Sequence, residues 1–111
     1  MIFCSKNEDY VPAWQLILEG RKTVTRRSKP TKVGAIRAVQ PQRCKKSVCK
    51  IRILSCVAHS EWKKSDGYLH GDLNAEAHLE GFITWNGLCD WFVENGIEME
   101  GTYRTEFEVV R

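Results

Sequence analysis

Residues 20–27, with the sequence GRKTVTRR, combine the side chains of this chain that are best suited to ligand chemistry. These eight residues carry four positive charges, two hydroxyls and one apolar side chain. Arginine and lysine contact anions, and threonine adds short hydroxyl donors, so the segment favours a ligand that carries a phosphate or a nucleobase. A solvated, charged edge strand is the alternative that composition leaves open.

The local pattern predicts a helix, a bend and then a strand around this segment. Apolar residues recur at helical spacing over residues 13–17, and Gly20 follows where a left-handed residue would end the helix. The β-branched run of residues 23–25 favours an extended strand. Lys22 and Thr25 would face opposite ways in a straight strand. They converge only if Lys22 lies in the bend after Gly20.

Charge is divided unevenly along the chain. Residues 1–57 hold 13 Lys/Arg and 3 Asp/Glu, a balance of +10, whereas residues 58–111 hold 4 Lys/Arg and 11 Asp/Glu, a balance of −7; together they return the net charge of +3. Such asymmetry indicates a basic surface that attracts polyanions. Electrostatic pairing of the two halves within one fold is the other interpretation.

Length and composition indicate one ordinary globular domain, residues 1–111. No run approaches the roughly 20 apolar residues of a membrane span, and the first residues do not resemble a signal peptide, so a cytoplasmic location is expected. The five cysteines, an odd number, favour reduced thiols. The spacing of Cys44 and Cys49 and of the histidines fits no zinc pattern, so neither a metal nor a cofactor is expected.

The remaining pattern predicts several strands and a few short helices. Strands are expected over residues 33–39, 47–57 and 102–110, the last with the clearest alternation. Asp9 and Pro12 are expected to open the first helix, Asp72 or Asn74 a second one that ends at Gly81, and Thr84 a third one that ends at Gly96. Mostly antiparallel strands of this kind close economically into a small barrel, which gives an α+β fold.

Residues 60–73 form the least regular stretch, and we expect a long loop there that carries function. Trp62 and Tyr68 lie among polar residues of this stretch. Both are candidates for stacking on a nucleobase, a contact worth roughly 1–3 kcal/mol. Trp85 falls on a helical apolar face, which makes a core position the better interpretation for it.

Three segments in order resemble the ASCH domain, a branch of the PUA-like β-barrel superfamily: residues 17–27 (ILEGRKTVTRR), 80–85 (EGFITW) and 103–110 (YRTEFEVV). The resemblance implies a small PUA-like barrel, mostly antiparallel, with two to three short helices. It also implies an RNA-related role. We therefore expect an RNA- or nucleotide-binding module with a basic cleft at residues 21–27, in which Arg21, Thr23, Arg26 and Arg27 contact the ligand.

One bacterial branch of the family, similar around the GRKT segment, consists of small amidohydrolases that remove acetyl from N-acetylcytidine. Its functional Lys, Thr and Glu would fall on Lys22, Thr25 and Glu80. This is the alternative function; a ribonuclease is a less favoured enzymatic one. The chain departs from that branch in the elaborated stretch of residues 60–73 and in the form of the segment that begins at Glu80.

The amidohydrolase chemistry is coherent, but burial and a neighbouring glutamate would have opposite effects on the pKa of Lys22. A threonine can act as a nucleophile when a base takes its proton. Lys22 would serve as that base if burial moved its pKa from about 10.4 towards 7. A glutamate beside it would raise the same pKa. A protein-interaction adaptor that uses the acidic second half, around Glu94, Glu98 and Glu100, is the third hypothesis, with its protein partner unknown.

Overall fold

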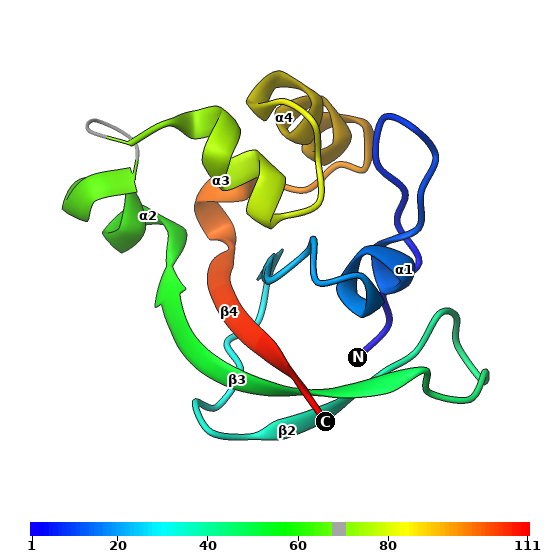
Figure 1. The fold of residues 1–111 in the computed structure, drawn as a ribbon. Helices are drawn as coiled ribbons and strands as arrows, with labels where there is room; N and C mark the ends of the chain where they lie inside the picture. The colour runs from blue at the N-terminus through cyan, green and yellow to red at the C-terminus, as the bar shows by residue number, and fades with distance from the viewer. Residues whose placement is uncertain (68–70) are drawn as a thin grey trace.

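The computed structural model describes residues 1–67 and 71–111, and a single antiparallel sheet organises this part of the chain (Figure 1). Its strand order is β1-β4-β3-β2. The central pair is long and carries one bulge between Ile53 and Ser55, while the two edge strands are short. The strands are β1 (Val24–Arg27), β2 (Ile36–Val39), β3 (Cys49–Ala58) and β4 (Tyr103–Val110).

The sheet is not closed, so the prediction of a barrel is wrong in this respect. The edge strands β1 and β2 each have four residues and pair only with β4 and β3, respectively. The N-terminal segment occupies the place where they would meet. The Phe3 backbone N–H donates to the Gln40 carbonyl at 2.9 Å, and the Ile2 carbonyl accepts from Arg27 at 2.7 Å.

The helices pack against the concave side of the sheet and above its end (Figure 1). The stretch predicted as a loop instead contains α2 and a π-helical turn, so that prediction is wrong for residues 60–67. The helical elements are α1 (Ala13–Leu18), α2 (His59–Trp62), the π-helix Lys63–Gly67, α3 (Leu73–Leu79), α4 (Trp85–Glu94) and the 3-10 helix Met99–Gly101. In the described ranges none is long and apolar enough to cross a membrane.

Side-chain caps define two helices as the sequence predicts. Asp72 accepts hydrogen bonds from the Asn74 and Ala75 backbones at the start of α3, and the Thr84 hydroxyl accepts one from the Gly87 backbone in α4. The predicted cap at Asp9 is wrong, because Pro12 occupies the N-cap position of α1 without a side-chain cap.

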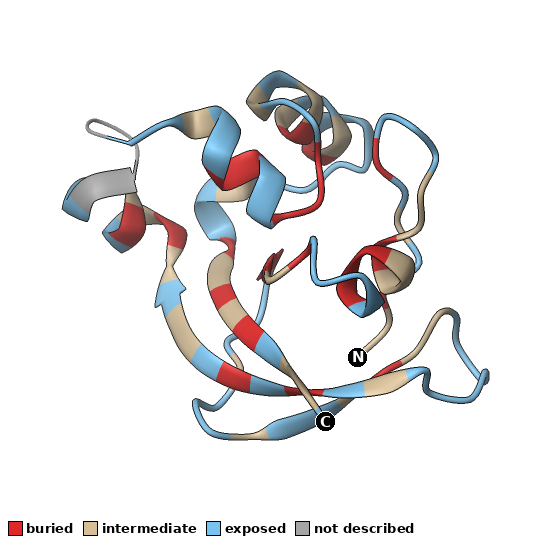
Figure 2. Ribbon diagram, viewed as in Figure 1, coloured by how far each residue is buried: buried red, intermediate tan, exposed pale blue. Residues whose placement is uncertain are grey.

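Two apolar clusters form the core, and Figure 2 shows buried residues in red. The larger lies between the sheet, α1 and the N-terminal segment; the smaller lies under α3 and α4. Their buried members are Phe3, Ala13, Ile17, Val39, Ile51, Ile53 and Phe107 in the first, and Ala77, Phe82, Leu88 and Phe92 in the second. The functional candidates lie between these clusters.

Gly81 and Gly20 both have a backbone conformation that favours glycine, but only Gly81 is closely packed. Both have positive φ, +92° and +76°, but a Cβ on Gly81 would lie 2.9 Å from Leu16 Cδ1, whereas a Cβ on Gly20 meets nothing within 4 Å. We expect Gly20→Ala to lower the free energy of unfolding by about 1 kcal/mol through backbone strain. Gly81→Ala should lower it by at least about 2 kcal/mol, because overpacking adds to the strain. Urea denaturation measures both values, and equal losses would contradict this account.

Candidate functional site

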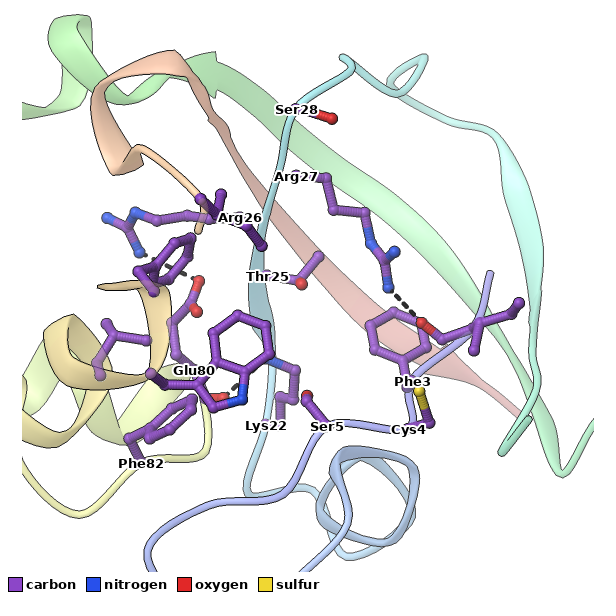
Figure 3. Close-up of a pocket in the computed structure, with 15 residues that line it drawn as sticks. Phe3, Cys4, Ser5, Lys22, Thr25, Arg26, Arg27, Ser28, Glu80 and Phe82 are labelled. Carbon is purple, nitrogen blue, oxygen red and sulfur yellow. Dashed lines mark hydrogen bonds and ion pairs between the residues drawn. The ribbon is translucent and has the colours of Figure 1, made fainter. Parts of the chain in front are cut away.

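A pocket of about 330 Å³ lies where β1, the N-terminal segment, the end of α3 and the helix α4 approach one another (Figure 3). Its walls combine aromatic side chains from both core clusters with polar groups of the GRKTVTRR segment. Lys22, Thr25 and Glu80, the three predicted catalytic residues, all line it. The other lining residues are Ile2, Phe3, Cys4, Ser5, Arg26, Arg27, Ser28, Phe82, Leu88, Trp91, Phe92 and Ile97.

The bend after α1 delivers Lys22 to this pocket. Gly20 has φ +76°, and the next two backbone N–H groups, of Arg21 and Lys22, both donate to the Leu16 carbonyl at 2.9 and 3.1 Å. Lys22 therefore lies before β1 begins, which is the condition that the sequence sets for its convergence with Thr25.

The same bend is joined to the end of α3. The Thr23 backbone N–H donates to the Leu79 carbonyl at 2.9 Å, and the Cβ position of Gly81 is only 3.5 Å from Lys22 Cβ. The lysine stem therefore runs alongside the backbone at the end of α3. This contact aligns Lys22 with the backbone of Glu80.

Lys22 is held by two backbone carbonyls. Its Nζ donates to Glu80 at 2.7 Å and to Val24 at 2.8 Å, and only 5% of the residue is exposed. Burial lowers the pKa of Lys22 to about 8, and the charges of Arg27 and Arg26 act in the same direction, whereas the charge of Glu80 opposes them. A neutral amine has two N–H groups and one lone pair, so it can satisfy both carbonyls and still accept a proton.

Arg26 is the centre of a buried polar network. Its Nη1 donates to Glu80 at 3.2 Å, its Nη2 to Glu76 at 2.7 Å and its Nε to His59 Nδ1 at 3.1 Å. The guanidinium also lies 4.5 Å from the ring centroid of Trp62, and its side chain is 0% exposed. The network therefore ties β1 to α2 and α3, and it uses all three nitrogens of the guanidinium.

Glu76 completes the network by joining β4 to it. Arg104 donates to both Glu76 oxygens, at 2.6 and 2.9 Å. Burial would raise the pKa of Glu76, but the hydrogen bonds and charges of Arg104 and Arg26 hold it below its usual value. Burial and Arg26 also lower the pKa of His59. A His59 that accepts through Nδ1 is neutral, which matches this direction.

Thr25 and Arg27 face the pocket with fewer partners. Thr25 is 7% exposed, and its hydroxyl makes no hydrogen bond with any described residue. Arg27 donates from Nη2 to the Ile2 carbonyl at 2.7 Å and stacks on Phe3 at 4.5 Å. Burial lowers the pKa of Arg27.

Other predicted site residues lie elsewhere. Arg21 is exposed and pairs with Glu19 at 3.4 Å, and Thr23 does not line the pocket. Trp62 is only 8% exposed and stacks on Trp85 at 6.1 Å, so it lies in the interior and not on a loop surface. Tyr68 lies outside the described residues.

The predicted basic cleft at residues 21–27 does not take the expected form, because Lys22 and Arg26 are buried and Arg26 is paired with carboxylates. Most of the exposed cations lie instead on the loop after β1, on β2, on the loop to β3 and on β3. They include Lys29, Lys32, Arg37, Arg43, Lys45, Lys46 and Lys50. No group of three possible metal ligands occurs in the part of the chain that the structure describes.

Sequence reasoning missed the N-terminal wall and the partners of Arg26. Cys4 and Ser5 line the pocket from the N-terminal segment, in which the sequence indicated no site residue. Glu76 and Glu80 are four residues apart, so they share one helical face, and this spacing is a signal that was available. Nothing local in the sequence marks Arg104 or His59 as their neighbours.

Comparisons with solved structures bear on the fold of this chain. No family model and no curated protein matches the sequence. Among solved structures, protein EF3133 of Enterococcus faecalis V583, described as DUF984, is 18% identical, with a TM-score of 0.53 over 88% of this chain and 69% of that one. An ASCH domain from Lactobacillus crispatus JV V101 is 20% identical, with a TM-score of 0.49 over 96% of this chain and 76% of that one. DUF984 belongs to the ASCH family, so the fold is ASCH-like.

Proposed function

We propose that this protein binds one nucleobase-containing ligand, a nucleoside or nucleotide, in the pocket beside Lys22. The observation that carries the proposal is the convergence of buried polar groups and aromatic walls on one cavity. Its volume of about 330 Å³ lies at the lower end of the range of small-molecule sites, roughly 300–1,000 Å³. A single base with its sugar suits such a space better than a nucleic-acid strand.

The aromatic walls and the polar groups have complementary roles in this proposal. Phe82 and Trp91 offer apolar faces to a planar base. Thr25 and Lys22 offer a hydroxyl and an amine to the polar edge of that base. If the ligand is one nucleotide of an RNA, the exposed cations around β2 are the groups that would meet its backbone.

Thr25→Val provides the first test, because valine keeps the shape of threonine and removes the hydroxyl. We expect the wild-type protein to bind cytidine or a related nucleoside, and Thr25→Val to weaken binding about fivefold, the effect of losing one hydrogen bond of about 1 kcal/mol. Thr23→Val, a matched control outside the pocket, should bind like the wild type. Isothermal titration calorimetry measures the three affinities. No binding of any nucleoside at millimolar concentration would refute the proposal.

Amide hydrolysis is a second candidate function, and the environment of Lys22 favours it. In the neutral form, Lys22 would take a proton from the Thr25 hydroxyl or from water while that oxygen attacks the carbonyl of an acylated cytosine. The carbon–nitrogen bond then breaks, and the Lys22 ammonium returns the proton to the leaving amine. If Thr25 is the nucleophile, water hydrolyses its acyl ester. Glu80, whose carboxylate is held by Arg26, would accept a hydrogen bond from the amide N–H.

The pH dependence of N-acetylcytidine hydrolysis tests this candidate. Lys22 must lose its proton to act as a base, so kcat/KM should rise as the pH increases through about 8. Lys22→Arg keeps the positive charge but cannot be deprotonated, and it should reduce the rate at least about a hundredfold. Arg21→Met, on the exposed side of the same bend, should not. Chromatography measures the cytidine that is released. If no cytidine forms, or if Lys22→Arg forms as much as the wild type, this reaction is ruled out.

A further inference from the structure

Arg27 is a largely enclosed cation for which no described residue provides a counter-ion. It lines the pocket, and burial lowers its pKa, although the charge of Glu80 acts in the opposite direction. Its Nη2 donates to the neutral carbonyl of Ile2, and its Nε is buried without a hydrogen-bond partner. Cationic groups away from water are normally paired, so this environment is unusual.

The neighbouring carboxylates are paired with other arginines, and the charge of Glu80 only partly offsets the effect of burial on the pKa of Arg27. Arg26 lies within ion-pair distance of Glu76 and Glu80, and Arg104 pairs with Glu76 and with the partly exposed Glu106, so the glutamates nearest the pocket are engaged by these two arginines. Within the described part of the chain, no carboxylate lies within ion-pair distance of Arg27. The positive charge that remains at the pocket therefore belongs to Arg27 and to the protonated form of Lys22.

The two remaining cations differ in what they can offer a ligand. Lys22 already donates to two backbone carbonyls, at 2.7 and 2.8 Å. The Nη1 of Arg27 makes no hydrogen bond with a described residue and is not among the fully buried polar atoms without a partner. Figure 3 shows the Arg27 side chain extending past Thr25 towards Phe3, along the wall that Cys4 and Ser5 continue. A guanidinium placed in this way suits a carboxylate or a phosphate.

We propose that the ligand of this pocket carries an anionic oxygen group, a phosphate or a carboxylate, which pairs with Arg27. The proposal rests on the proposed function and names its ligand class more closely: a nucleotide, or a base that carries an acidic acyl group, in place of a neutral nucleoside. We do not assign this role to Arg26, because its side chain is fully buried and is paired with two carboxylates of the protein.

Calorimetry with three ligands tests the proposal and separates the two sources of charge. The ligands are cytidine, cytidine 5′-monophosphate and N4-succinylcytidine. We expect one of the two anionic ligands to bind at least tenfold more tightly than cytidine, and the ligand with the gain identifies the source. The gain should disappear in Arg27→Gln and persist in Arg21→Gln, which removes an exposed cation from the same segment. If cytidine binds and neither anion gains affinity, or if the gain survives in Arg27→Gln, the anion site is refuted while the nucleobase pocket stands.

Melting temperatures measured with inorganic phosphate test the anion site without a nucleobase. If no nucleoside binds, but phosphate raises the melting temperature of the wild type and of Arg21→Gln and not of Arg27→Gln, the anion site stands and the nucleobase proposal fails. If phosphate has no effect either, both fail. Arg27→Lys keeps the charge and should retain part of the gain. Failure of both Arg27 variants to fold would assign a structural role to the guanidinium and overturn the proposal.

Discussion

The buried guanidinium of Arg26 is the interaction on which the site depends. It extends from β1, its cross-strand neighbour on β4 is Arg104, and both arginines reach Glu76 on α3. Glu80, one helical turn further along the chain, accepts from the same guanidinium through its side chain and from Lys22 through its carbonyl. One arginine thus sets the position of α3 over the sheet, and with it the carbonyl that holds the pocket lysine.

This arrangement places a network of paired charges beside a positively charged pocket. The network contains two arginines, two buried glutamates and His59, and Arg104 also pairs with the partly exposed Glu106. Losing one partner of such a network is costly because a buried charge is left unpaired. The pocket beside it retains Lys22 and Arg27, whose charges are less well compensated. Enclosed ionisable groups with a lowered pKa are typical of ligand sites, and this is why the proposals centre on them.

The sequence predicted those features that depend on local chemistry. Gly20 ends α1 with a positive φ, Thr84 caps α4, and the alternating pattern at the C-terminal end forms β4. The side-chain period of a strand set the condition that Lys22 must precede β1 if it and Thr25 are to face one site, and both line the pocket. These features depend on a few neighbouring residues, so one sequence suffices to find them.

The features that the sequence did not predict depend on distant partners. The partners of Arg26 lie on α2 and at α3, far from β1 in the chain, so the burial of Arg26 has no local signal. Helix α2 has only four residues, too few for a 3.6-residue period to appear, and Trp62 therefore looked like a loop residue. Closure of the sheet was inferred from a general preference for avoiding edges. Here the N-terminal segment lies between the edge strands instead.

The free energy of unfolding of Arg26→Met, measured by urea denaturation beside that of Arg52→Met, tests the central claim most directly. Arg52 forms an exposed pair with Glu108 at 3.1 Å, so it provides a control with the same change of side chain. We expect a loss of about 3–5 kcal/mol for Arg26→Met, because two buried carboxylates lose a partner. The loss for Arg52→Met should be at most about 1 kcal/mol. Equal losses in the two variants would contradict the claim that Arg26 holds the site together.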